Sequence, residues 1–530
     1  MQERICSPPG KILGDFWRNL PKHLKITFFA TFIAGVLTHG YVFSNFLLNH
    51  DGMSYFLPMV MGDTLRTLSS GRWFQDTALS LSGTIPVPWV IGLLSVFYLS
   101  LTATVVAACL ELKRALYAVL VGVVLVTFPS AGVVFAYVHV ADSIFLSVFL
   151  ACLAAFVCKK FRFGFFFGAI ILAFSLGIVQ TYITMTAGLL VMMLILDILS
   201  KQERIQTLLL RSFKYLSCLV LGLVIYFLVL RYMLTTQGVT LSEYQGIDQM
   251  GQMPFYRYWA LIQIAYQEFF SFFTAYTHDL PAVLVPISLP LILILVMLVL
   301  LVMSRPSNKD SIPQLILLLV LLALFPLAVT AIFIMGVHFI YLMLLYALSL
   351  VLVLMIALLD RLDISLQSMN LSVKKYIGVI ACWISLATLV LIPYAHAVTL
   401  NGNYLQTDLV MRQTAHVSST LTQRIRSFPG YVEGMPVVLV GYHTLGSTTA
   451  ISQMQQHSPI FGFPTTEILI HWHSYQQFFE IFLGENMNLH FLRYNTTDGA
   501  NFDTISALSI FPADGSMVII DGALFIRMGH

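Results

Sequence analysis

Residues 282–336 read AVLVPISLPLILILVMLVLLVMSRPSNKDSIPQLILLLVLLALFPLAVTAIFIMG, two long apolar runs separated by the polar segment Arg305–Lys309. A helix that crosses a lipid bilayer needs about 20 mostly apolar residues, and each run supplies that length. A short basic segment between two such runs is typical of a loop that stays on the cytoplasmic side. The stretch therefore predicts two spanning helices joined by a cytoplasmic loop.

The same pattern repeats along the chain of 530 residues, which is 58% hydrophobic and 10% charged. We predict about eleven spanning helices, at 24–48, 86–110, 115–130, 140–158, 164–179, 181–198, 215–236, 282–303, 313–336, 338–359 and 376–399. The segment 164–198 is short for two spans, and one long span with a re-entrant piece fits it as well. The predicted fold class is a polytopic α-helical membrane protein.

The distribution of Lys and Arg predicts the orientation. If the basic N-terminal tail lies in the cytoplasm as a retained anchor, every second loop should be basic. Those loops are 111–114, 159–162, 201–214, 305–309 and 361–375, and all five carry Lys or Arg. The stretches 49–85, 131–139 and 237–281, with the tail after 400, are then expected outside, which only an odd number of spans permits.

The composition changes after Tyr394, so we predict a membrane domain at 1–399, with outer loops 49–85 and 237–281, and an outer α/β domain at 400–530. About 130 residues suffice for such a domain. The pattern predicts an amphipathic helix at 404–427, a buried strand at 435–441, a helix at 465–484 and a hairpin at 517–526. All six cysteines precede residue 400, so the outer domain needs no disulfide.

Both long outer loops carry apolar residues at helical spacing and aromatic residues typical of the lipid–water interface, so we expect membrane lipid to contact them. The run Tyr55–Val60 and the residues Tyr256, Trp259 and Phe270 are examples. The net charge is only +3, and nothing indicates nucleic acid. The chain has no glycine-rich phosphate loop with a lysine, which argues against a nucleotide-driven pump.

The first candidate for chemistry is a carboxylate at the outer end of the first helix, in Leu48-Asn49-His50-Asp51-Gly52. There Asp51 could act as a base where an acceptor hydroxyl meets a lipid-linked substrate, with His50 beside the substrate. Aspartate is also a favoured first residue of a helix, so Asp51 could instead cap the interfacial helix that follows. The sequence leaves both roles open, and they can coexist.

The same outer loop contains Gly71-Arg72-Trp73, with Arg66 about two helical turns earlier. A guanidinium group binds phosphate oxygens through two parallel hydrogen bonds. We therefore take Arg72 and Arg66 as candidate ligands of a donor phosphate and Trp73 as a substrate contact. Anchoring of Arg72 and Trp73 to lipid headgroups explains the pattern equally well.

Two further groups lie near predicted outer helix ends. His139 and Asp142 are one helical turn apart and share a face, and ionisable residues at the top of an apolar helix indicate function; a helix cap with a solvated histidine is the alternative. Gln180 and Tyr182 interrupt the apolar run between two short helices and could bind a sugar, or could form a plain turn. His471-Trp472-His473 lacks acidic or thiol ligands at metal spacing, so no metal site is predicted.

Several of these segments together resemble the serotype-converting glucosyltransferases of Gram-negative bacteria and their phages, of the glucosyl transferase II type, which look like members of the GT-C class. The segments are Asn49-His50-Asp51, Gly71-Arg72-Trp73, Asp142, Gln180-Thr181-Tyr182, Asn403-Tyr404, the strand ending at Gly441, and Phe511-Pro512-Ala513-Asp514-Gly515-Ser516. The resemblance covers nearly the full length of the chain.

The resemblance implies a bacterial inner-membrane enzyme that moves glucose from undecaprenyl phosphate to O-antigen repeat units at the periplasmic face. It implies that Asp51 is catalytic and that Asp142 supplies a second carboxylate. Members often carry two adjacent acidic residues at the first position, whereas this chain has His50-Asp51-Gly52. Dependence on a divalent metal is left open, because GT-C relatives differ in it.

Three classes of function are compared. An inverting glycosyltransferase with a polyprenyl-phosphate sugar donor and a lipid-linked O-antigen acceptor needs one base and cations for the departing phosphate, which Asp51 and Arg72 could supply. A transporter or flippase of lipid-linked sugars predicts paired broken helices in related halves, and no repeat between halves is visible. A receptor or structural subunit needs only the topology.

Overall fold

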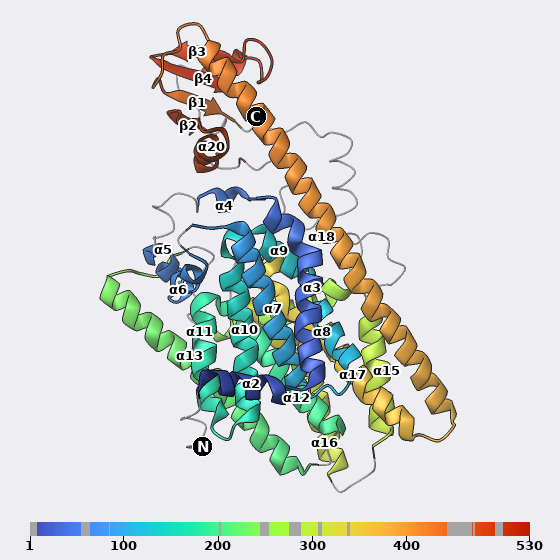
Figure 1. Ribbon diagram of the computed structural model, residues 1–530. Coiled ribbons are helices and arrows are strands. Elements are labelled where there is room, and N and C mark those ends of the chain that lie inside the picture. Colours follow the sequence, from blue (N-terminus) through green and yellow to red (C-terminus); the bar gives the residue numbers. More distant parts are fainter. Residues whose placement is uncertain are drawn as a thin grey trace.

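The computed structural model is a bundle of helices with a small sheet standing beyond one end (Figure 1). It describes residues 8–54, 64–83, 85–200, 203–243, 254–274, 288–305, 310–335, 340–441, 469, 472–492 and 502–529. The predicted interfacial run Tyr55–Val60, the residue His471 and the end of the outer loop 237–281 lie outside the described residues.

The long helices are α2 (Pro9–Asn19), α3 (Lys22–Ser44), α7 (Pro88–Cys109), α8 (Ala115–Thr127), α9 (Pro129–Ala136), α10 (Val138–Lys160), α11 (Gly164–Ile178), α12 (Ile183–Ser200), α13 (Ile205–Gln237), α14 (Phe255–Thr274), α15 (Leu289–Met303), α16 (Ser311–Val329), α17 (Ser349–Ser368) and α18 (Val373–Ser427). Shorter ones are α4 (His50–Ser54), α5 (Thr64–Ser69), α6 (Gln75–Leu79), η1 (Ser80–Ser82), η2 (Gln180–Tyr182), η5 (Ala331–Met335) and η6 (Leu342–Leu348).

Within the described ranges, eight helices are long and apolar enough to cross a membrane, or nine if the bent pair α8 and α9 is one span. Two shorter apolar helices, α11 and α15, occupy further predicted segments. A helix or a helix pair lies at each of the eleven apolar segments. The chain is thus a polytopic helical membrane protein, while the number of spans stays a prediction.

The expectation of an outer loop at 131–139 is wrong. Residues Pro129–Ala136 form α9, every residue of which is buried, at 44° to α8. The break falls at Phe128, whose φ of −58° and ψ of 138° are non-helical, because the residue before a proline is pushed out of the α region. Pro129 then occupies the first turn of α9, where its missing N–H costs nothing.

The segment 164–198 forms two helices, as one of the two interpretations predicted. Helix α11 ends at Ile178, Val179 is extended, and the chain re-enters a helix at Gln180. Helix α11 packs closely on α10, where Ser147 and Ser175 exchange hydrogen bonds to each other's carbonyl groups at 2.9 and 2.8 Å. Small residues allow helices in a membrane to approach this closely.

The described parts of the five predicted basic loops lie together at one end of the bundle. Lys159 contacts Glu111 at 2.7 Å, Arg361 donates to the carbonyl oxygen of Leu110 at 2.8 Å, and Lys214 donates to that of Phe161 at 2.7 Å. The amide of Gln314 donates to the carbonyl oxygen of Glu203 at 2.6 Å. The alternation read from the charges is therefore consistent with the fold, while the side of the membrane on which this end lies stays a prediction.

Helix α18 runs for 55 residues, from the last predicted span through residue 399 into the outer segment, and ends beside the sheet (Figure 1). Side chains of α3 form hydrogen bonds with the middle of α18. His39 donates from Nε2 to the carbonyl oxygen of Val126 and accepts at Nδ1 from the hydroxyl of Tyr404, both at 2.7 Å. Tyr41 donates to Asp408 at 2.9 Å. The predicted amphipathic helix at 404–427 is confirmed as a continuation of the last span.

The sheet holds β1 (Val437–Val440), β2 (Leu489–Leu492), β3 (Met517–Ile520) and β4 (Ala523–Arg527), in the order β2-β1-β4-β3. Strand β1 is parallel to β2 and β4, and β3 is antiparallel to β4. The predicted hairpin is confirmed, since Asp521 and Gly522 link β3 to β4 with positive φ of 48° and 78°, as a two-residue turn requires. The predicted helix at 465–484 is described as α20 (Trp472–Phe478) and η7 (Phe479–Leu483).

Candidate active site

Helix α4 presents Asp51 at the end of the bundle opposite the basic loops. Its side chain is exposed. The helix is capped by Asn49, whose Oδ1 accepts a hydrogen bond from the backbone N–H of Gly52 at 2.8 Å. Asparagine is a favoured cap because its side chain binds a free N–H of the first turn. The reading of Asp51 as the cap is therefore wrong. His50 lies in the same helix, and its side chain is outside the described part.

Gly52 seats α4 directly on the start of α10. A Cβ at this position would lie 3.0 Å from Nδ1 of His139. His139 and Asp142 are both buried, at 4% and 1% exposure, so the alternative of a solvated histidine is wrong. Oδ1 of Asp142 accepts from the backbone N–H of Ser143 at 2.8 Å. A buried carboxyl group thus lies in the first turn of α10, next to the histidine on which α4 packs.

The segment that holds α6 and η1 reaches the same turn of α10. Helix α6 packs on α10 and α11, and η1 packs on α7. Ser82 in η1 lies close enough to hydrogen-bond the Asp142 carboxyl group, and Tyr98 in α7 lies within electrostatic range of it. Residues 75–82 therefore pack beside the start of α10 and bring Ser82 close to Asp142.

A tight turn at residues 70–73, here called the arginine turn, sets the position of Arg72. Gly71 adopts a φ of +76°, and a Cβ there would lie 2.6 Å from Nε2 of Gln180, so glycine is required. Gln180 donates to the carbonyl oxygen of Ser70 at 2.9 Å and to the hydroxyl of Tyr226 at 3.1 Å. That hydroxyl donates to the carbonyl oxygen of Gly71 at 3.0 Å. Two side chains from different helices thus clamp the turn.

The guanidinium group of Arg72 is half-buried and lies within electrostatic range of the Tyr182 and Tyr226 hydroxyls. The indole of Trp73 packs on Gly177 of α11, and the next residue, Phe74, donates its N–H to the Gly177 carbonyl at 2.7 Å. Nε1 of Trp73 is buried without a hydrogen-bond partner in the part of the chain that is described. Arg66 lies on α5 and is exposed.

The unit that contains the β-sheet touches the helix that carries Asp51. Helix α20 packs on α4 (Figure 1), and the ring of Phe482 in η7 lies 5.4 Å from that of Phe46, which follows α3. The β-sheet unit is therefore placed beside the candidate base, although no residue of that unit was predicted as a site residue.

A comparison with protein families finds that the model described as glucosyl transferase GtrII matches residues 40–355. The chain belongs to this family. The predicted resemblance is confirmed, and this GtrII-family protein is a membrane glycosyltransferase. The match spans α4, the arginine turn, the start of α10 and η2, and it leaves out the sheet. Comparisons with curated proteins and with solved structures found no match.

Tyr182 of this GtrII-family protein is placed in a structural contact. Its side chain is buried at 1% exposure, and its hydroxyl donates to the carbonyl oxygen of Met343 in η6 at 3.3 Å. Its ring meets that of Tyr346 edge to face. The contact joins η2 to η6, and a role of Tyr182 in substrate binding stays a prediction.

Two residues of the site were missed by sequence reasoning. Tyr226 lies in the middle of a uniform apolar run, where a tyrosine reads as one more apolar residue of a span. Asn49 was noted in its motif, but the capping role was given to Asp51, two residues later. The signal for Asn49 is the three-residue spacing to Gly52, which matches the reach of a capping side chain.

Metal-ligand clusters were sought in the described ranges. No three His, Cys, Asp or Glu residues come together there. The side chains of Trp472 and His473 lie outside the described part, as does His471. Metal dependence therefore stays open, as it does in the sequence.

Replacing Gln180 by alanine is expected to lower transfer about tenfold, mainly through a higher KM for the sugar donor. The substitution removes both donations from Nε2, each worth about 1 kcal/mol, and frees the arginine turn. Steady-state kinetics of purified protein measures the effect. Gln237→Ala, at an exposed glutamine that ends α13, is the matched control.

The assignment of Gln180 as a positioning residue has a second test. In an Arg72→Ala background, Gln180→Ala should cost little more activity, because the residue acts through Arg72. Equal losses in both backgrounds would contradict this role.

Proposed function

We propose that the chain transfers glucose, with inversion, from a polyprenyl-phosphate donor to lipid-linked O-antigen repeat units at the periplasmic face of the bacterial inner membrane. In this orientation the N-terminus is cytoplasmic and the sheet is periplasmic. The observation that carries the proposal is an exposed carboxylate, Asp51, at the same end of the bundle as a clamped arginine, Arg72, in a chain of the GtrII family.

Asp51 is the general base of this proposal. It takes the proton from the acceptor hydroxyl, whose oxygen attacks the anomeric carbon of glucose. The bond from that carbon to the phosphate oxygen breaks on the opposite face, so the configuration inverts and polyprenyl phosphate departs. Phosphate is a good leaving group, so one base and a cation meet the demands of the reaction. Asp142 is the second carboxylate.

Arg72 binds the departing phosphate in this scheme. A guanidinium group forms two parallel hydrogen bonds with a phosphate and compensates the charge that develops on it. The indole N–H of Trp73, adjacent in the arginine turn, adds a donor for a phosphate oxygen, and Arg66 adds charge nearby. His50 and His139 flank the sugar, and Gln180 holds the turn in place.

The two substrates approach from different sides. We assign the lipid tail of the donor to the membrane-facing surface of α14, where Tyr256, Trp259 and Phe270 are exposed. Such aromatic side chains favour the interface between lipid and water. We assign the acceptor glycan to the sheet unit, because α20 packs on α4 beside Asp51.

The test is transfer of radiolabelled glucose from synthetic polyprenyl-phosphate-glucose to a lipid-linked O-antigen acceptor by purified full-length protein in detergent. We expect transfer from this donor and none from a nucleotide-linked glucose, and the product should carry the anomeric configuration opposite to that of the donor. Product with retained configuration, or transfer from the nucleotide sugar alone, would contradict the proposal.

A flippase would give a different result in the same preparations. Proteoliposomes with the purified chain would move the lipid-linked sugar across the bilayer, while no sugar would reach the acceptor. The bent pair α8 and α9 is one broken element in the described ranges, whereas a transporter of this kind uses a pair in related halves. The glycosyltransferase is therefore the better-supported function.

A further inference from the structure

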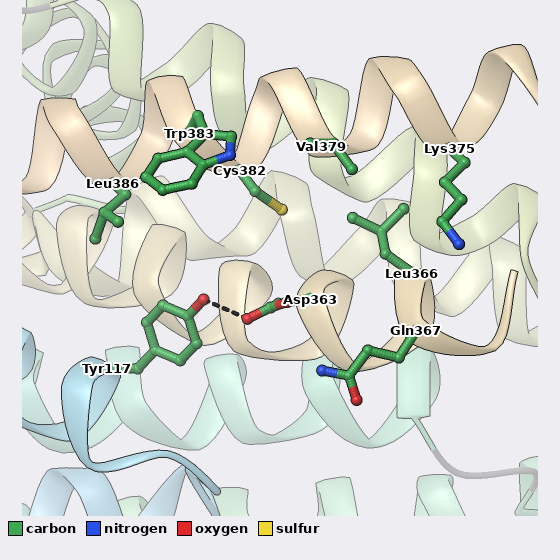
Figure 2. Close-up of a pocket in the computed structure, with 9 residues that line it drawn as sticks. All are labelled: Tyr117, Asp363, Leu366, Gln367, Lys375, Val379, Cys382, Trp383 and Leu386. Atoms are coloured by element: carbon green, nitrogen blue, oxygen red, sulfur yellow. Dashed lines mark hydrogen bonds between the residues drawn. The ribbon is translucent and has the colours of Figure 1, made fainter. Parts of the chain in front are cut away.

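The end of the bundle opposite Asp51 contains a cavity between α17 and α18. The residues of α18 that line it are Lys375, Val379, the adjacent pair Cys382 and Trp383, and Leu386, which recur about once per helical turn and so lie along one side of the helix. Asp363, Leu366 and Gln367 do the same on α17. The two faces oppose each other, and Tyr117 of α8 completes the lining (Figure 2).

Close packing fixes the width of this cavity. A Cβ on Gly378 would lie 2.7 Å from Cδ2 of Leu366, so the two helices touch at that point. Beyond it they leave a cavity of about 430 Å³, within the range of small-molecule sites. Helices α17 and α18 both qualify as membrane spans, so a cavity at the rim between them is accessible to lipid.

The charges around the cavity favour an anion. Asp363 is compensated, since it forms an ion pair with Arg114 and accepts a hydrogen bond from the Tyr117 hydroxyl at 2.7 Å. Lys375 therefore adds a net positive charge. Its ammonium group donates to the carbonyl oxygen of Met369 at 2.8 Å, and an ammonium group has two further N–H donors. A negatively charged headgroup would compensate this charge.

The lining changes from polar to apolar along α18. Lys375 and Gln367 lie near the loop between the helices, whereas Val379 and Leu386 lie farther from that loop along α18 (Figure 2). From Lys375 to Leu386 the helix rises by about 16 Å. Trp383 is 68% exposed and borders the cavity about 12 Å along the helix from Lys375. The cavity thus has a cationic end and an apolar wall.

We propose that this cavity binds one anionic glycerophospholipid, with its phosphate on Lys375 and an acyl chain along Val379, Trp383 and Leu386. The bound lipid would fill the space between α17 and the long helix α18. The site lies at the other end of the bundle from Asp51 and is independent of the sugar chemistry.

Native mass spectrometry of the purified full chain, titrated with phosphatidylglycerol or with phosphatidylethanolamine, tests the site. We expect one phosphatidylglycerol to bind at least about fivefold more tightly than phosphatidylethanolamine, in line with one basic residue near a lipid phosphate. Lys375→Gln should lose this preference. Lys374→Gln, at the exposed neighbouring lysine, makes the same change of charge outside the cavity and should retain it.

A second variant separates the cavity from the general charge of the loop. Val379→Trp fills the space and leaves every lysine in place, so it should also lose the single bound lipid. Equal losses from Lys374→Gln and Lys375→Gln, or retention of the lipid by Val379→Trp, would overturn the proposal. Preferential binding of polyprenyl phosphate would overturn it too, since it would make the cavity a second site for the donor lipid.

Discussion

Asp51→Asn is expected to lower glucose transfer by about 10²–10⁴-fold, the range that general-base catalysis contributes. The amide has almost the same shape as the carboxylate, so α4 should still be capped by Asn49 and should still pack against His139. The loss should therefore appear in kcat, with little change in KM for the donor. Transfer assays with the synthetic lipid-linked donor measure it.

Asp15→Asn is the matched control for this variant. Asp15 is an exposed carboxylate on α2 that pairs with Arg18 at 3.2 Å, so its replacement repeats the chemical change far from the site and should leave transfer intact. The thermal midpoint of Asp51→Asn should equal that of the unmodified chain. Full activity of a correctly folded Asp51→Asn variant would remove Asp51 from the mechanism.

Arg72→Ala should lower kcat/KM by about 10²–10³-fold, as the removal of a group that stabilises transition-state charge commonly does. Arg72→Lys should recover only part of the loss, because an ammonium group keeps the charge but cannot bind the phosphate with two parallel hydrogen bonds. The measurement is steady-state transfer at varied donor concentration.

Two other arginines serve as controls for the loss of activity in Arg72→Ala. Arg66 is exposed on α5, so Arg66→Ala should cost no more than about fivefold, the scale of an exposed ionic contact. Arg231 is exposed on α13 at the same end of the bundle, and Arg231→Ala should leave transfer unchanged. If all three variants lost activity equally, Arg72 would act only through the general positive potential of this surface.

The positions of the helices could be predicted because their determinants are local. Apolar length and the alternation of basic loops identify each helical segment, and the two-residue turn at Asp521-Gly522 identifies the hairpin. The prediction at 131–139 failed because a buried helix with Pro129 in its first turn has the length and small residues of a loop. Helix α18 was divided at residue 399 because its hydrophobicity ends there, whereas helical hydrogen bonding continues for another 28 residues.

The polar residues of the candidate site were singled out from the sequence, but the contacts between distant segments that hold them were not. Asp142 and His139 share a face because both lie on one helix, which their spacing shows. The clamp on the arginine turn joins Ser70, Gln180 and Tyr226, three residues distant in sequence, and no local pattern carries such a contact. The packing of α20 on α4 was missed for the same reason, because it is also a contact between segments that are distant in sequence.

Helix α18 connects the membrane-spanning bundle to the sheet, so the rotation and the rise of the sheet along the helix axis are coupled. Its 55 residues extend about 80 Å, of which the hydrocarbon core takes about 30 Å, and ion pairs of Arg424 with Asp514 and of Arg426 with Glu485 fasten the sheet to its end. One residue added between 412 and 424 would turn the sheet by about 100° and raise it by about 1.5 Å. A change in the length of α18 therefore alters the distance of α20 from Asp51 and the orientation of α20 around the helix axis at the same time.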